Sequence, residues 1–286
     1  MNDSAGTGGS NNVAIGFGTL RRNSDSGQVA VGSNSMNVNT SGEGNTAVGY
    51  NTLLANTTGN YNTAIGYDAL YTNVHGDGNV ALGYKALYTA APADNTGFNI
   101  ALGYKALYAN TTGVGNVVIG TNALDSNTGS NNVIMGTNAA QGATTMDSST
   151  IIGHEAAGGG VPTGDYNTIV GYQAGYALNG AVESNAFFGH RAGYSDTTGK
   201  QNTFIGYTAG FTNTIGNYNV ALGQAALYTN IDGDNNVAIG HQALYTTDPA
   251  DGAGKNVALG HAAGFNNTTG TGNVFIGYEA GANTDH

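Results

Sequence analysis

Three residue types that usually shape a protein are absent or rare in this sequence. It contains no cysteine and no tryptophan, and proline occurs three times in 286 residues. The lack of cysteine excludes disulfide bonds and thiolate metal ligands. The scarcity of proline excludes collagen-like and polyproline structures. No run of 18 apolar residues occurs, so the sequence predicts no membrane-spanning helix and no membrane insertion.

Charged side chains are also scarce. They make up 9% of the chain, against about a quarter in ordinary domains. The net charge is −11, and the seven Lys and Arg residues are scattered along the sequence. No basic stripe could follow a phosphate backbone, so nucleic acid is not an expected partner. The opening residues MNDSAGTGGSNN lack the basic and apolar regions of a secretory signal peptide.

What the sequence has in abundance is one short motif. Its core reads N-[VT]-A-[IVL]-G, as in NTAIG at 62–66 and NVALG at 79–83. The final glycine, which we call the bend glycine, recurs every 16–18 residues, with two intervals of 20. A motif that recurs at a nearly constant spacing within one chain indicates a repeat protein. Because glycine has no Cβ, it fits a tight bend or a place where a second backbone passes close by. The sixteen bend glycines are Gly16, Gly32, Gly49, Gly66, Gly83, Gly103, Gly120, Gly136, Gly153, Gly171, Gly189, Gly206, Gly223, Gly240, Gly260 and Gly277.

The residues just before the bend glycine have the pattern of a strand. Positions one and three before it are occupied by large apolar and β-branched residues, as Ile65 and Thr63 are before Gly66. Because these positions are two apart, they share one face of a strand, and we expect that face to form the core. The residue between them, Ala64, is alanine in nine copies and bulky in the others. The opposite face is therefore also expected to be buried, against another layer or another subunit.

Asparagine stands four positions before the bend glycine in fourteen of the sixteen copies. Asparagine is disfavoured inside strands, so its recurrence at one register needs a structural reason. We expect the side chains to form an amide ladder between stacked coils or to bind turn backbone. The column comprises Asn12, Asn45, Asn62, Asn79, Asn99, Asn116, Asn132, Asn167, Asn185, Asn202, Asn219, Asn236, Asn256 and Asn273.

An aromatic or imidazole ring commonly follows the bend glycine. Rings of this kind stack on sugar faces and their hydroxyls form hydrogen bonds, which makes the column a candidate ligand-contact surface. The alternative is that the rings pack against the solenoid and fill grooves between subunits. Four histidines occupy the same column, and only His241 and His261 lie on successive copies, which favours ring stacking over metal binding. The tyrosines are Tyr50, Tyr67, Tyr84, Tyr104, Tyr172, Tyr207 and Tyr278.

Each repeat thus reads as a strand, a glycine bend, a short second strand and a turn. This length is too short for a helix and a strand together, but it suits one coil of a solenoid. The predicted fold class is all-β: a parallel β-roll or β-solenoid of about 16 coils of 16–20 residues. Residues 11–282 form a single repeat domain, preceded by a lead-in at 1–10 and followed by a tail at 283–286. The two 20-residue copies contain Pro92 and Pro249, and we expect these inserts to bulge from the turn edge.

No catalytic or cofactor chemistry is predicted, so the chain is not expected to be an enzyme. The acidic residues lie mainly in turns, and neither a cysteine nucleophile nor a G-x-S-x-G motif occurs. The segments HGDGN at 75–79 and IDGDNN at 231–236 faintly resemble calcium loops but lack the glutamate that closes an EF-hand loop. Ordinary Asp-Gly turns are the better interpretation, and calcium there is a weaker alternative.

The repeat core, read as NVAIG at 12–16 and 236–240 and as NTAIG at 62–66, resembles the head repeat of trimeric autotransporter adhesins such as Yersinia adhesin A. Similar arrays occur in phage tail fibres and in bacterial tail-fibre-domain proteins. The resemblance covers all sixteen repeats, although the repeats are longer here and the tyrosine-bearing half differs. It implies a left-handed β-roll that assembles as a homotrimer of side-by-side rolls, with Val13 and Ile15 facing the roll interior.

The function that this resemblance implies is structural and adhesive. We expect a rigid trimeric head or shaft segment of a phage tail fibre or bacterial surface adhesin, located on a virion or a cell surface. Its partners would be further copies of the chain and a glycan, matrix component or protein receptor on a host surface. Two alternatives remain open: a polysaccharide-degrading enzyme on a solenoid scaffold, and an extracellular filament that assembles end to end.

Overall fold

The structure is a computed structural model that describes residues 9–90, 96–247 and 253–283. Lead-in residues 1–8, residues 91–95 and 248–252, which contain Pro92 and Pro249, and tail residues 284–286 lie outside the described residues, and so does the bulge expected at the two prolines. The chain is an all-β parallel solenoid, and hydrogen-bonded residues on successive coils are commonly 17 positions apart. Its described part contains no helix, and so none that is long and apolar enough to cross a membrane.

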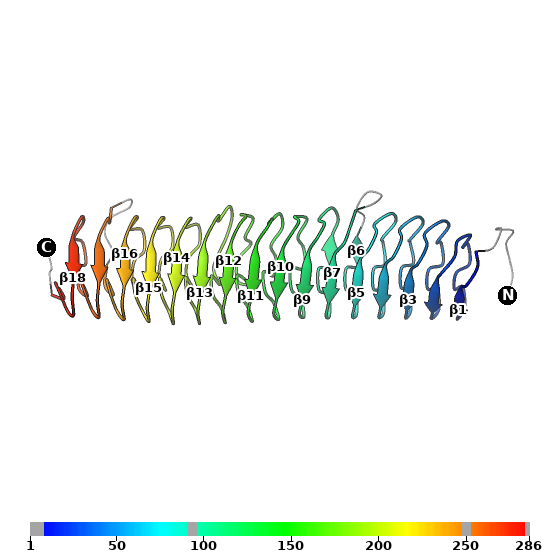
Figure 1. The fold of residues 1–286 in the computed structure, drawn as a ribbon, viewed down its shortest axis with the longest axis horizontal. Coiled ribbons are helices and arrows are strands. Elements are labelled where there is room, and N and C mark those ends of the chain that lie inside the picture. The colour runs from blue at the N-terminus through cyan, green and yellow to red at the C-terminus, as the bar shows by residue number, and fades with distance from the viewer. Residues whose placement is uncertain (1–8, 91–95, 248–252, 284–286) are drawn as a thin grey trace. The chain divides into compact units, whose positions relative to one another are not determined.

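Contacts divide the solenoid into two units, which are described separately. Unit 1 consists of Met1–Thr137 and Thr144–Met146. Its three-residue strands pair in parallel with their neighbours, in register, so that Ala47 lies beside Ala64 and Ala64 beside Ala81 (Figure 1). The strands of unit 1 are β1 (Val13–Ile15), β2 (Val29–Val31), β3 (Thr46–Val48), β4 (Thr63–Ile65), β5 (Val80–Leu82), β6 (Thr89–Ala90), β7 (Ile100–Leu102), β8 (Ala109–Asn110), β9 (Val117–Ile119) and β10 (Val133–Met135).

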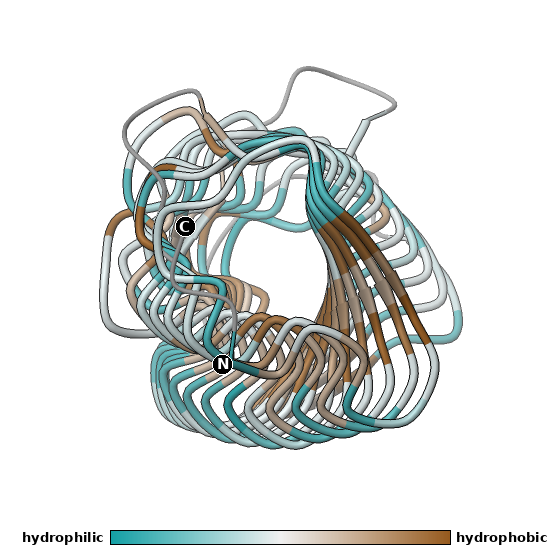
Figure 2. Cartoon of the chain, turned by 90° about the vertical axis from the view of Figure 1, so that its left-hand side faces the viewer, coloured by the Kyte–Doolittle hydropathy of each residue, from teal (hydrophilic) through white to brown (hydrophobic). Residues whose placement is uncertain are grey.

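Unit 2 consists of Asn138–Ala143 and Asp147–His286. Its strands follow the same rule, and each one pairs in parallel with the next along the chain. Hydrophobic positions recur at the same place in successive coils, as the end-on view shows (Figure 2). The strands are β11 (Thr150–Ile152), β12 (Thr168–Val170), β13 (Ala186–Phe188), β14 (Thr203–Ile205), β15 (Val220–Leu222), β16 (Val237–Ile239), β17 (Val257–Leu259) and β18 (Val274–Ile276).

The structure reverses the expected assignment of the two strand faces. In β4 the middle residue Ala64 is fully buried, whereas Thr63 is half-buried and Ile65 is exposed. The prediction that Val13 and Ile15 face the interior was wrong, because both side chains are exposed. The physical reason is that a three-residue strand with its middle residue pointing inward has a single inward position. The two flanking residues then point outward together.

In most coils the interior is shared by two positions of complementary size. One is the middle residue of the strand, and the other stands four positions after the bend glycine. Ala64 is matched by Leu70, whereas Phe187 is matched by Gly193, where a Cβ would lie 2.6 Å from Phe187 Cε2. Interiors are close-packed, so a large residue at one position goes with a small residue at the other. Ala258 and Gly264 are both small, and there a Cβ at Gly264 would lie 2.6 Å from Phe275 Cδ2 of the next coil. Further pairs are Ala81 with Leu87, Ala101 with Leu107, Ile151 with Ala157, Phe204 with Gly210 and Ala221 with Leu227.

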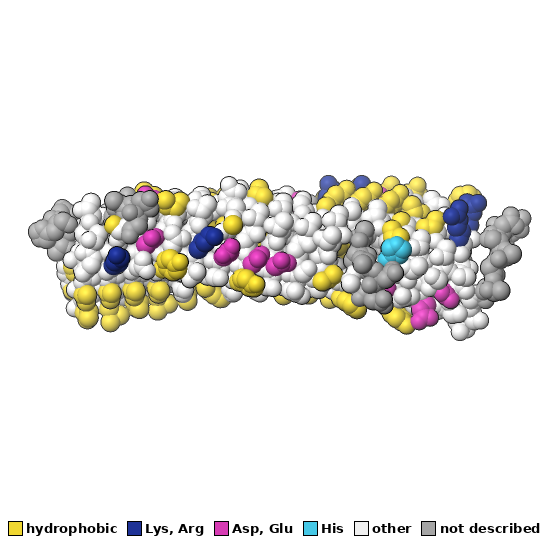
Figure 3. Space-filling model, turned by 90° about the horizontal axis from the view of Figure 1, so that it is seen from above, with side chains coloured by type: hydrophobic (Ala, Val, Ile, Leu, Met, Phe, Trp, Pro, Cys, Tyr) yellow, Lys and Arg dark blue, Asp and Glu magenta, His cyan; other side chains and the backbone are white. Residues whose placement is uncertain are grey.

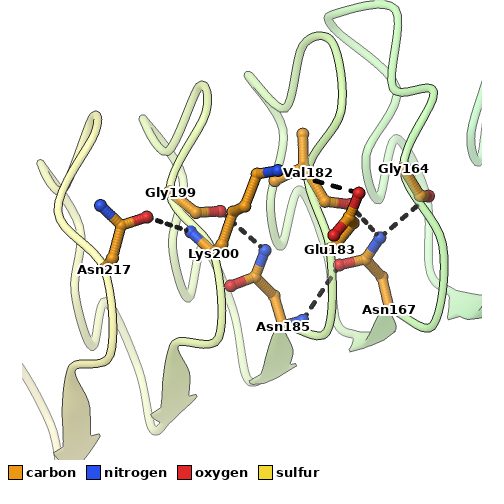
Figure 4. A network of polar contacts seen from close by, with 8 residues as sticks. All are labelled: Gly164, Asn167, Val182, Glu183, Asn185, Gly199, Lys200 and Asn217. Carbon is orange, nitrogen blue, oxygen red and sulfur yellow. Dashed lines mark hydrogen bonds and ion pairs between the residues drawn. The ribbon is translucent and has the colours of Figure 1, made fainter.

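The asparagine column lies on the inward side, two positions before the buried strand centre. Twelve of its fourteen members are buried, and Asn12 and Asn273 are partly buried. In unit 2 the backbone N–H of Asn185 donates to Asn167 Oδ1 at 3.0 Å. Asn167 Nδ2 donates to the turn carbonyls of Gly164 and Val182 at 3.1 and 2.7 Å (Figure 4). One side chain therefore joins two coils and supplies the partners that buried backbone groups require.

The bend glycines have a steric role that Gly171 illustrates. Its φ is +146°, a conformation that residues with a Cβ rarely adopt. A Cβ at this position would also overlap the carbonyl group of Gly189 on the next coil. Both the backbone angle and the close approach of a second backbone therefore exclude a side chain here.

Candidate ligand-binding surfaces

The predicted ligand-contact tyrosines form a continuous stack in unit 1. Tyr50, Tyr67, Tyr84 and Tyr104 lie on four successive coils, with ring centroids 5.0, 5.5 and 5.2 Å apart and interplanar angles of 11–22°. All four side chains are 40–47% exposed. We call this set the first ring ladder of unit 1. Because each ring face covers the next, the ladder presents ring edges and hydroxyl groups to solvent, and its interior faces are not open to a sugar ring.

In unit 2 the same column mixes tyrosine with histidine. His154, Tyr172, His190 and Tyr207 stack at 4.9–5.5 Å, and Tyr278 stacks on the imidazole of the preceding coil. The described residues contain no group of three or more His, Cys, Asp or Glu side chains that could hold a metal ion. The imidazoles in this column thus occupy ring positions of a stack.

A second ring ladder, which was not predicted from the sequence, runs beside the first. Tyr71, Tyr88 and Tyr108 are half-buried and stack at 5.0 and 5.1 Å, with interplanar angles of 12° and 7°. The signal was present in the sequence, because a ring stands five positions after the bend glycine in GYDALY and GYKALY. The corresponding ladder of unit 2 is Tyr176, Tyr194, Phe211, Tyr228, Tyr245 and Phe265.

Polar side chains occupy the strip between the two ladders. In unit 1, Asn51 Nδ2 donates to Asp68 Oδ1 at 3.1 Å, and Lys85 Nζ lies 4.0 Å from Asp68 Oδ2. Lys85 Nζ is 5.4 and 5.1 Å from the ring centroids of Tyr84 and Tyr88, one in each ladder. Such cation–π contacts stabilise the position of the ammonium group between the rings. We call Asn51, Asp68, Lys85 and Lys105 the polar strip.

The polar strip of unit 2 has the same construction with other residues. Gln173 Nε2 donates to Glu155 Oε2 at 2.7 Å, and Arg191 Nε donates to Gln173 Oε1 at 2.9 Å. The Arg191 guanidinium lies 6.0 and 5.2 Å from the ring centroids of Tyr172 and Tyr194. Three of the seven basic residues of the chain, Lys85, Lys105 and Arg191, therefore lie between the ring ladders.

The outward side chains of the strands form a separate apolar surface on each unit. We call this surface, formed by the residues one and three positions before each bend glycine, the strand face. None of its positions carries Asp, Glu, Lys or Arg in any of the sixteen copies. Rows of hydrophobic side chains are visible at the edge of the space-filling view (Figure 3). Its exposed large members are Val13, Ile15, Val29, Ile65, Leu82, Val133 and Met135 in unit 1, and Phe188, Ile205, Leu222, Leu259, Val274 and Ile276 in unit 2.

A second buried amide column lies seven positions after the bend glycine, and it too was not predicted from the sequence. In unit 1, Asn56 Nδ2 donates to Asn39 Oδ1 and Asn73 Nδ2 donates to Asn56 Oδ1, at 2.7 and 2.9 Å. In unit 2 this column contains a carboxylic acid, Asp196, whose pKa is raised to about 7 by burial. The backbone N–H of Gly199 and the side chain of Asn213 donate hydrogen bonds to it and oppose that rise.

Asp196 stands where the second amide column begins in unit 2. The corresponding residue of the preceding coil is Leu178, which offers no acceptor to an amide donor. Asp196 Oδ2 instead accepts hydrogen bonds from Asn213 Nδ2 at 3.0 Å and from Asn202 Nδ2 at 3.3 Å. A residue that only needs to accept therefore fits this end of the column.

The two Asp-Gly segments weighed as calcium loops are used as turns. Asp77 Oδ1 accepts the backbone N–H of Asn60 at 2.6 Å, and Asp234 Oδ1 accepts that of Asn217 at 2.7 Å. Each carboxylate thus substitutes for the amide or hydroxyl oxygen that fills this position in other coils, for example Ser130 with the N–H of Val114. Aspartate side chains commonly bind turn backbone in this manner.

Comparisons of the chain with protein-family models, with curated proteins and with solved structures gave no match.

Proposed function

We propose that this protein is a structural and adhesive fibre segment that assembles side by side with further copies of itself through the strand face. The observation that carries this proposal is the exposure of two uncharged, largely aliphatic columns along each unit. Contiguous apolar surfaces of this kind are rare on monomers and commonly mark interfaces. Homo-oligomers are usually closed and symmetric, and the resemblance of the repeats to trimeric adhesin heads favours three copies.

The repeat chemistry supports a mechanical role. Successive coils are joined by backbone pairing, by the buried asparagine column and by ring stacking, so each coil is held by its neighbours at several points. A segment built this way adds length without changing its cross-section. We therefore propose a head or shaft segment on a virion tail fibre or on a cell surface, with a host glycan, matrix component or receptor as its partner.

Light scattering coupled to size-exclusion chromatography tests the assembly. The full chain is expected to have three times the 28.7 kDa mass of one copy. The double substitution Ile205→Lys and Leu222→Lys places two charges on the strand face and should shift the mass toward that of one copy. Ile215→Lys is the matched control, because Ile215 is 40% exposed, close to the 38% of Ile205, but lies outside the strand face.

The outcomes separate cleanly. A monomeric wild-type chain would refute assembly through the strand face, and so would an oligomer that the double substitution leaves intact. Circular dichroism on each variant verifies that the solenoid still forms. Loss of the oligomer in the Ile215→Lys control would show that a different surface mediates the contact.

A further inference from the structure

We propose that the first ring ladder of unit 1 and the adjoining polar strip bind a linear, uncharged, β-1,4-linked glycan whose chain runs along the ladder. This inference rests on the proposed adhesive function and names the ligand class of one surface. The contacts are made by phenol hydroxyls, by ring edges and by the polar strip. They differ from the face-on stacking that the sequence alone suggested.

The first step of the argument is the orientation of the rings. Tyr67 has a ring on either side, at 5.0 and 5.5 Å, so both of its faces are covered. Tyr67 is nevertheless 47% exposed. Because both ring faces are covered, we infer that the exposed part of the ring is its edge and its hydroxyl. Sugar hydroxyls offer both donors and acceptors to a row of phenols, which also donate and accept. The ladder therefore presents a row of hydrogen-bonding groups, one on each coil.

The second step is the spacing of that row of tyrosines. The ring centroids are 5.0–5.5 Å apart along the ladder. An extended peptide advances about 3.3 Å per residue and a polyproline helix about 3.1 Å, so neither places one residue on each coil. One pyranose of an extended β-1,4-linked chain advances by roughly the ladder spacing. Each successive sugar thus meets an equivalent tyrosine, which gives a repeated contact without a curved site.

The third step is the charge of the surface. The polar strip of unit 1 contains one carboxylate, Asp68, and two ammonium groups, of Lys85 and Lys105. Lys85 lies near Asp68 and offsets its charge, which leaves the strip with one net positive charge, that of Lys105 against two tyrosine rings. One positive charge does not form a basic stripe that could hold a polyanion. The net charge of −11 disfavours polyanionic chains. Single-stranded nucleic acid would also need open ring faces for its bases, which the stack does not offer.

The experiment measures binding of oligosaccharides to the full chain by isothermal titration calorimetry. The probes are cellobiose, cellotetraose and cellohexaose, with maltohexaose as the α-1,4-linked control whose curved chain leaves the register. We expect affinity to rise at least tenfold from cellobiose to cellotetraose, because the longer chain contacts more tyrosines of the ladder. We expect maltohexaose to bind at least tenfold more weakly than cellohexaose.

A hydroxyl-deletion variant locates the site. Replacing Tyr50, Tyr67, Tyr84 and Tyr104 together by Phe keeps the stacked rings and removes the four hydroxyls. We expect this variant to lose at least tenfold in affinity for cellohexaose. Tyr61→Phe is the matched control, since Tyr61 is an exposed tyrosine of the same unit outside both ladders, and it should bind like the wild type.

Several results would overturn the inference. They are absence of binding to every β-1,4-linked probe, equal binding of maltohexaose, and full binding by the four-fold Phe variant. A preference for an extended peptide in the same titration would also overturn it and would point to a matrix protein. The strand-face assembly is measured independently by light scattering, so a failed glycan titration with an intact oligomer refutes only this inference.

Discussion

Phe187 and Gly193 share the interior of one coil: a Cβ at Gly193 would lie 2.6 Å from Phe187 Cε2. In seven of the nine coils with alanine in the strand, leucine occupies the place of Gly193, as Leu70 does opposite Ala64, and the other two have Met36 and Gly264. The leucines of this column adopt the left-handed conformation that glycine also has there, with φ of +51° at Leu70 and +60° at Gly193. Backbone geometry therefore permits either residue, and the volume that the strand residues of the same and the neighbouring coil leave free decides between them.

This relationship predicts a compensating pair of substitutions. Phe187→Ala alone should lower the free energy of unfolding by about 3–5 kcal/mol, because it leaves a cavity. Gly193→Leu alone should be destabilising through overpacking. The double variant recreates the pairing of Ala64 with Leu70, and we expect it to recover most of the lost stability. Chemical denaturation of the four proteins measures the coupling, and additive effects would contradict shared volume.

The bend glycine predicts a position-specific penalty. Gly171→Val should destabilise unit 2 by at least about 1–3 kcal/mol, from backbone strain and from overlap with Gly189. Gly272→Asn is the matched control. Gly272 also has a positive φ, +70°, but no atom lies within 4 Å of its added Cβ, and Asn131 adopts φ +60° at the same repeat position. We expect the control to change stability by less than about 0.5 kcal/mol in thermal melting. Equal melting temperatures for the two variants would contradict the steric explanation.

The buried acid Asp196 predicts a pH dependence of stability. Burial raises its pKa from 3.8 to about 7 in the folded protein, so the folded state holds a proton that the unfolded state releases between these pH values. The stabilisation of the folded state by this bound proton is complete below pH 3.8 and disappears as the pH rises through 7. At about 1.4 kcal/mol per unit of pKa, the loss amounts to at most about 4 kcal/mol.

Asp196→Asn isolates this effect from other titrating groups. The amide keeps an acceptor for Asn213, and its Nδ2 can donate to the carbonyl of Gly199 as Asn213 Nδ2 does to Gly216 at 3.0 Å. The variant should therefore gain stability relative to the wild type as the pH rises from 4 to 8, in denaturant titrations at each pH. Parallel pH profiles for the two proteins would show that Asp196 does not titrate in this range.

The sequence predicted the repeat and the fold class because each coil repeats the chemistry of the last. The register of NTAIG and NVALG identifies one strand per repeat, and the observed pairing of Thr63 with Val80 and Ile65 with Leu82 follows that register. Other columns were equally visible but were not identified. The second ring ladder, Tyr71 to Tyr108, and the second amide column, Asn39 to Asn73, repeat with the same regularity.

The direction in which each strand face points could not be obtained from the pattern. Thr63 and Ile65 look like a core because they are two apart and β-branched, but alternation shows only that Ala64 points the other way. What decides the direction is the volume left inside the coil, and that volume depends on Leu70, which lies on a different segment. Only the closed coil brings Ala64 and Leu70 together and leaves Ile65 exposed.

The candidate ligand surface, too, could be predicted from the sequence only in part. The sequence by itself determined that rings recur once per coil, since Tyr50, Tyr67, Tyr84 and Tyr104 follow successive bend glycines. The tertiary structure decided how the rings face. Parallel stacking of coils sets their centroids 5.0–5.5 Å apart, so each ring covers its neighbour and turns its edge to solvent. That orientation arises from contacts between residues about 17 positions apart, which no single repeat contains.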